Sequence, residues 1–226
     1  MTNKDEKTMK ENKRVFGYFE VLFDIFYLLV ALIAGVYLIS TAVDKPRQLA
    51  GLMALMLVGG DLFHLVPRIA VILTGDEVRW RRALGFGKLV TSITMTVFYV
   101  LLWHLGLLVY AVTNATIWTG LVYALAVLRL WLCFLPQNKW YDAQPPVSWG
   151  IYRNIPFLLM GAAVALLFGI YNGQVPGLTW MWLGVLLSFA FYLPVVIWAS
   201  RQPKLGMLML PKTCAYLWMI YMLLSL

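Results

Sequence analysis

The fold is decided by residues 15–40, which read VFGYFEVLFDIFYLLVALIAGVYLIS and contain two charged side chains, Glu20 and Asp24. A helix rises about 1.5 Å per residue, so this stretch is long enough to cross the ~30 Å hydrocarbon core of a bilayer. The apolar part of a cleavable signal sequence is only about 7–15 residues long. We therefore expect a retained first transmembrane helix.

The rest of the chain continues this pattern. Of its 226 residues, 62% are hydrophobic and 12% are charged, whereas a soluble domain is about half apolar and about a quarter charged. We predict an all-α polytopic membrane protein, a bundle of about seven transmembrane helices that forms one domain over residues 15–226 behind a charged cytoplasmic tail, 1–14. The predicted spans are 15–40, 48–74, 84–110, 115–135, 151–171, 178–200 and 205–226.

The basic residues outside these spans predict the orientation, because Lys and Arg accumulate in cytoplasmic loops. Eleven fall on the side of the N-terminus and two on the other side, Lys45 and Arg47. The N-terminus is therefore expected inside and the C-terminus outside, in a multi-pass protein of the cell or inner membrane. The net charge of +8 is expected to meet lipid headgroups, so membrane lipids are predicted partners and nucleic acid is not.

Ionisable residues inside the spans are the candidate functional groups, since each costs about 2.5–3.5 kcal/mol to insert into hydrocarbon. Glu20 and Asp24 lie four residues apart, on one helical face. Asp61, His64 and Arg68 follow at i, i+3 and i+7, again on one stripe. The expected ligand-binding set is Asp61, His64, Arg68, Lys88, Arg129, Arg153, Glu20 and Asp24.

The depth of these groups suggests separate roles. The basic members and Lys212 are expected in the cytoplasmic half, where they would receive an anion, while Asp61 and His64 lie nearer the midplane and could exchange a proton. A structural interpretation stays open for several of them. Arg68, Arg153 and Lys212 could snorkel to the interface, and Glu20 and Asp24 could pair with basic groups of other helices.

Metal and cofactor chemistry finds little support. The chain has only two histidines, His64 and His104, on different spans, whereas catalytic zinc usually takes three protein ligands. No metal and no cofactor are therefore expected. Hydroxyls in transmembrane helices usually bond to backbone carbonyls or to a neighbouring helix, and we expect the same of Thr91, Ser92, Thr94 and Thr96.

Three functions remain open from the sequence. The first is a small transporter or ligand-binding protein with a cytoplasm-facing polar cavity for an anionic or amphipathic small molecule. The second is an intramembrane lipid-modifying enzyme, a hydrolase or transferase, with His64 as general base. The third is a structural membrane subunit. Enzymatic activity, the identity of the ligand, the direction of transport and the oligomeric state are not decided by the sequence.

Overall fold

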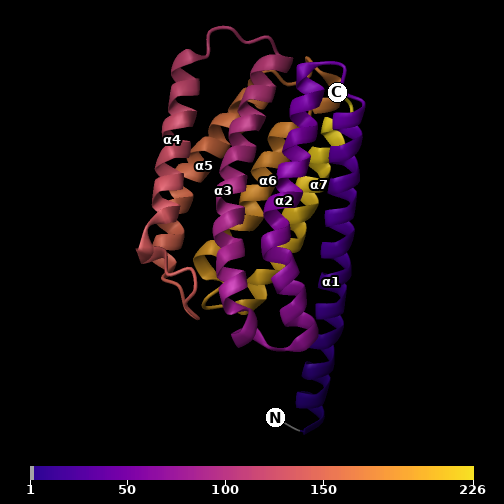
Figure 1. The fold of residues 1–226 in the computed structure, drawn as a ribbon, viewed down its shortest axis with the longest axis vertical. Coiled ribbons are helices and arrows are strands. Elements are labelled where there is room, and N and C mark those ends of the chain that lie inside the picture. Colours follow the sequence, from indigo (N-terminus) through magenta and orange to yellow (C-terminus); the bar gives the residue numbers. More distant parts are fainter. Residues whose placement is uncertain (1–2) are drawn as a thin grey trace.

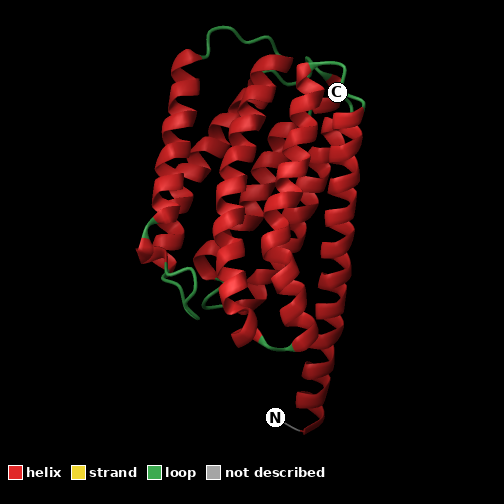
Figure 2. Cartoon of the chain, in the orientation of Figure 1, coloured by secondary structure: helices red, strands yellow, loops and turns green. Residues whose placement is uncertain are grey.

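The chain folds into a bundle of long antiparallel helices (Figures 1 and 2). The computed structural model describes the backbone of residues 3–226 and the side chains from residue 15 onward, except that of Pro203. Every helix and turn in this described part belongs to an all-helical architecture without strands. The helices are α1 (Asn3–Ser40), α2 (Lys45–Thr74), α3 (Glu77–Val109), α4 (Thr116–Phe134), α5 (Val147–Ile170), α6 (Met181–Trp198) and α7 (Met209–Leu223).

Six of these helices, α1 to α6, are long and apolar enough to cross a bilayer. The chain is therefore a multi-pass membrane protein, as its composition predicted. The last helix, α7, has 15 residues and is preceded by a 3-10 helix at Pro203–Leu208. Helical backbone thus covers most of the predicted seventh span, 205–226, although α7 alone is shorter than the other six.

One predicted boundary was wrong. The basic segment from Asp76 to Arg82 was expected to form a loop, but α3 begins at Glu77 and includes Arg79, Arg81 and Arg82 in its first turns. The turn is short for two reasons. Gly75 ends α2 in the left-handed conformation, with φ 74°, and the Asp76 side chain accepts a hydrogen bond from the Arg79 amide at 2.9 Å, which caps α3.

The predicted charged tail, residues 1–14, continues directly into the first span. From Asn3 onward its backbone belongs to α1, and Figure 1 shows α1 extending beyond the other helices at this end. Residues 1 and 2 and the charged side chains of the tail lie outside the described residues.

The helices form a closed ring. In sequence, α1 packs on α2, α2 on α3, α3 on α5, α5 on α6 and α6 on α7, and α7 returns to α1, while α4 lies outside against α5 and α3. One end of the bundle carries the N-terminus and the joints α2–α3, α4–α5 and α6–α7 (Figure 1). We call it the N-terminal end. The opposite end carries the C-terminus (Figure 1).

Glycines set the close approach of α2 and α3. A Cβ placed on Gly87 would collide with the backbone carbonyl of Phe63, and one on Gly60 would collide with the Thr94 side chain. Gly59, next along α2, has no neighbouring atom within 4 Å. The two helices can therefore pack closely through Gly60 and Gly87, and this packing fixes the position of Asp61 and His64 relative to α3.

The first prediction tests this contact. Gly87→Ala should lower the free energy of unfolding by about 1–3 kcal/mol, because the added methyl meets backbone that cannot rotate away. Gly59→Ala is the matched control and should be neutral or stabilising by up to about 1 kcal/mol, since alanine favours helix and the space is open. Denaturant unfolding in detergent micelles would measure both. Equal effects of the two variants would contradict the proposed packing.

Candidate functional site

A hydrogen bond joins the first two helices near their middle. The hydroxyl of Tyr27, on α1, donates to Oδ2 of Asp61, on α2, at 2.6 Å. Tyr27 is fully buried and Asp61 is partly buried. Lys212 of α7 acts electrostatically on Asp61, although the two side chains form no ion pair within 4 Å. Asp61 is therefore held by one phenol and faces one ammonium group.

Glu20 and Arg68 form an interhelical ion pair. Arg68 donates from Nε to Oε1 at 2.7 Å and from Nη2 to Oε2 at 3.3 Å. The arginine side chain is 46% exposed and the glutamate side chain 16%. These two predicted ligand-binding residues therefore satisfy each other, which is the structural role left open for Glu20 by the sequence.

Asp24, one turn from Glu20 on the same face of α1, has no such partner. Its side chain is only 5% exposed, and its Oδ2 atom is buried without a hydrogen-bond partner among the described residues. Asp24 is thus a buried carboxyl group that packing alone does not explain.

His64 lies among positive charges. Its Nδ1 is buried without a hydrogen-bond partner in the described part of the chain, and Lys88, Arg68 and Lys212 all act on it electrostatically. Lys88 of α3 and Lys212 of α7 are therefore within electrostatic range of His64.

The hydroxyl run of α3 is committed to backbone carbonyls, as the sequence predicted. Thr91 of α3 donates to the carbonyl of Gly60 of α2 at 3.1 Å, so this hydrogen bond joins the two helices. Ser92 and Thr96 donate to carbonyls one turn earlier in their own helix, each at 2.8 Å. None of these hydroxyls is hydrogen-bonded to His64 among the described residues.

Arg129 is the most unusual residue of the bundle. It is 2% exposed, and its guanidinium carbon lies 3.3 Å from the centre of the Phe157 ring. Its Nε and Nη1 atoms are buried without hydrogen-bond partners, and no carboxylate within 4 Å pairs with it among the described side chains. Arg153 is close enough to add repulsion. The stacking offsets part of the cost of burial, but the charge itself is not neutralised.

Two further cations, Arg153 of α5 and Lys212 of α7, lie beside aromatic rings. Arg153 stacks on Trp140, with 4.2 Å between its guanidinium carbon and the ring centre, and donates to Oδ1 of Asn138 at 2.9 Å. Lys212 lies 4.9 Å from the ring centre of Tyr192 and 5.3 Å from that of Tyr216. We call Arg129, Arg153 and Lys212 the cation cluster.

Neighbouring aromatic rings connect Arg129 and Lys212 of the cation cluster. The ring of Phe157, on which Arg129 stacks, lies 6.4 Å from that of Tyr192, which Lys212 covers. Tyr99 and Phe189 also pack on Phe157, with ring centres 5.0 and 4.8 Å away. Sequence reasoning identified the charges but missed these rings and Tyr27, because an aromatic residue in an apolar span carries no polarity signal.

Burial differs between the two ends of the bundle. No residue is fully buried over 61–66 of α2, 88–94 of α3 or 190–199 of α6 and its end, and none among the described side chains of 200–214. A helix packed on one face should bury every third or fourth residue, as α6 does at Met181, Gly184, Val185 and Ser188. These stretches of α2, α3, α6 and α7 therefore remain partly accessible, whereas Cys133, Asn138 and Asn154 at the same end are buried.

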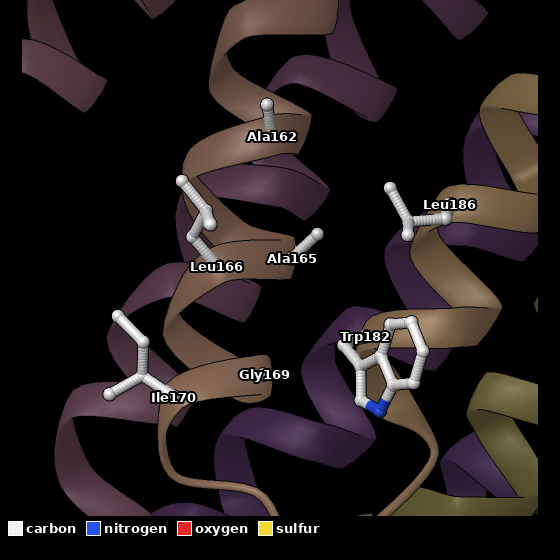
Figure 3. A pocket seen from close by; sticks show the side chains of 7 residues that line it. All are labelled: Ala162, Ala165, Leu166, Gly169, Ile170, Trp182 and Leu186. Atoms are coloured by element: carbon white, nitrogen blue, oxygen red, sulfur yellow. The ribbon is translucent and has the colours of Figure 1, made fainter.

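Two surface hollows lie elsewhere. One, of about 460 Å³, runs between α5 and α6, where Ala162, Ala165 and Gly169 face Trp182 (Figure 3). The other lies on α4 around Tyr123 and Trp131. Both are almost entirely apolar, and neither is lined by a predicted ligand-binding residue. His104 is also remote from the cation cluster in its contacts, because its Nε2 is hydrogen-bonded to the Tyr123 hydroxyl at 2.7 Å.

Comparisons with protein-family models, curated proteins and solved structures gave no match. The geometry of the site is therefore the basis for the function proposed below.

The second prediction concerns the Tyr27–Asp61 hydrogen bond. A double-mutant cycle with Tyr27→Phe and Asp61→Asn should give a coupling energy of about 1–2 kcal/mol in unfolding, because each single variant strands the partner in a buried position. Tyr18→Phe is the control: Tyr18 is 57% exposed, and its coupling to Asp61→Asn should be near zero. Additive effects of Tyr27→Phe and Asp61→Asn would show that this bond does not join α1 to α2.

Proposed function

We propose that the chain is a small membrane transporter or ligand-binding protein that takes an anionic or amphipathic small molecule at the cation cluster. The observation that carries this proposal is the buried guanidinium of Arg129, whose Nε and Nη1 have no partner among the described residues. Breaking a buried ion pair costs about 3–5 kcal/mol, because it leaves one charge uncompensated. An arginine kept in that state is best explained by a ligand that supplies the missing negative charge.

The chemistry of the cluster supports an anion with an apolar part. Arginine offers planar donors that match a carboxylate or phosphate, and Lys212 and Arg153 add positive charge nearby. The faces of Phe157 and Tyr192 supply apolar surface beside the charges. The partly accessible side chains at the N-terminal end provide the approach, in the place where the sequence predicted a polar cavity.

The other two functions receive less support. The enzyme interpretation needs an activated nucleophile or water beside His64, and the nearby hydroxyls of α3 are bonded to carbonyls. A purely structural subunit would be expected to pair its buried charges as Glu20 and Arg68 do. Arg129 departs from that pattern.

The third prediction compares Arg129→Met with wild type. Methionine keeps much of the side-chain volume and removes the buried charge, so the ligand-free protein should be as stable as wild type or more stable. Thermal stabilisation by decanesulfonate, a single-chain anion, should be lost, with affinity at least about tenfold weaker, equivalent to ~1.4 kcal/mol. Thermal unfolding with and without the anion measures both quantities.

Arg201→Met is the matched control, since Arg201 is exposed in the α6–α7 joint. It should leave the response to decanesulfonate unchanged. The proposal is wrong if the thermal stabilisation by decanesulfonate persists in Arg129→Met, because Arg129 would then not belong to the anion site.

We further propose seven spans, with the N-terminus inside and the C-terminus outside. The N-terminal end carries Arg79, Arg81, Arg82 and Lys139 in or beside its joints, whereas the opposite end carries Lys45 and Arg47. This bias matches the preference of basic residues for the cytoplasmic side, and it places the cation cluster in the inner half of the membrane.

The fourth prediction tests this orientation. Alkaline phosphatase fused after Leu226 should be active, because this reporter folds only outside the cytoplasm, and the same reporter fused within the Pro136–Pro146 joint should be inactive. Activity of the joint fusion and inactivity of the C-terminal fusion would reverse the orientation. Inactivity of both would mean that α7 does not cross the membrane.

A further inference from the structure

We infer that the carboxyl group of Asp24 is a proton-binding site, and that its proton is taken up together with the anion at the cation cluster. The first statement stands on the surroundings of Asp24. The second also rests on the proposed function.

Charged and titratable groups from three helices surround Asp24 or its direct neighbours. On α1 these are Glu20 and Tyr27, one turn to either side, and on α2 they are Arg68 and Asp61. From α7, Tyr216 acts on Tyr27 and Lys212 acts on Asp61. Two other carboxyl groups, Glu20 and Asp61, and one cation, Arg68, therefore act electrostatically on Asp24.

The possible partners of Asp24 are already engaged. Arg68 is held in two hydrogen bonds by Glu20, and the Tyr27 hydroxyl donates to Asp61. Asp24 itself is 5% exposed, with a buried Oδ2 that accepts from nothing among the described residues. A bare carboxylate in such a place carries a large desolvation cost, which binding a proton removes.

A proton and a metal ion could each stabilise this carboxyl group, and they need different surroundings. The described residues contain no group of three Asp, Glu, His or Cys side chains arranged to hold a metal. A proton needs only one carboxyl group.

Intervening residues link Asp24 to the cation cluster. Tyr27 connects the face of Asp24 to Asp61, and Asp61 faces Lys212, which lies over Tyr192 beside the ring that carries Arg129. An anion bound at Lys212 competes with Asp61 for that positive charge. The negative charge on Asp24 and Asp61 then becomes less favourable. Asp24 takes a proton from water, which removes one of these negative charges. One anion and one proton enter together, so no net charge is added to the bundle.

The test uses the full-length protein in lipid nanodiscs. Infrared spectroscopy at neutral pH should show the C=O stretch of a protonated, buried carboxyl group, and Asp24→Asn should remove that band. Asp142→Asn is the control, because Asp142 is exposed in the α4–α5 joint. It should leave the band unchanged. A band that persists in Asp24→Asn overturns the proton site.

A stability measurement guards against misfolding of the variant. Asparagine has nearly the shape of a neutral carboxyl group, so Asp24→Asn should unfold at the same denaturant concentration as wild type at neutral pH. A large destabilisation, beyond that of Asp142→Asn, would show that Asp24 is an ionised partner of another group and would also overturn the inference.

Coupling is measured with decanesulfonate, whose own charge does not change with pH. At a pH high enough to remove the Asp24 band from the ligand-free protein, its affinity for wild type should rise as pH falls, approaching about tenfold per pH unit for one linked proton, and in Asp24→Asn the dependence should flatten. Unchanged pH dependence in Asp24→Asn overturns the coupling. If wild type does not bind this anion at any pH, the proposed function and the coupling fail together, while the infrared band still decides whether Asp24 binds a proton.

Discussion

A charge inside a membrane-spanning bundle must be neutralised, because neither lipid nor packed side chains can replace water around it. This constraint separates the ionisable residues of the chain into two groups. Glu20 with Arg68 and Tyr27 with Asp61 are paired across α1 and α2 at 2.7 and 2.6 Å. Arg129 and Asp24 are more deeply buried than any of the other charged residues with described side chains, yet neither is paired. A ligand could neutralise the residues of the unpaired group.

The packing of the bundle explains how such groups are tolerated. Tyr99, Phe157 and Phe189 form an aromatic layer from α3 through α5 to α6, in which Tyr99 meets both phenylalanine rings edge-to-face. The hydroxyl of Tyr99 is hydrogen-bonded to that of Ser188 at 2.9 Å. Toward the C-terminal end, α6 and α7 bury residues at regular helical spacing. Toward the N-terminal end they bury none. The well-packed half thus supports the cations from one side.

Sequence reasoning predicted what depends on composition and failed where contact geometry decides. Hydropathy alone located the six long spans, and the depth of Arg129 and Lys212 placed both near the N-terminal end. Sequence reasoning did not predict that α3 begins at Glu77. It treated Asp76 as one charge of a basic loop, whereas Asp76 caps the helix through a hydrogen bond from the Arg79 amide. Nor did it assign partners: Glu20 and Asp24 share one face and one chemistry, and only coordinates show that Arg68 pairs with the first.

The two unpaired groups, Arg129 and Asp24, lie on helices that do not pack against each other. Arg129 belongs to α4, which packs on α5 and α3, and Asp24 belongs to α1, which packs on α2 and α7. A bundle selected only for stability would bring two such opposite charges together or replace both with apolar residues, since either change relieves the cost of burial. This bundle keeps them on helices that do not adjoin. An arginine and a carboxyl group, buried separately and both unpaired, fit the proposal that this protein takes up an anion and a proton at different places without gaining net charge.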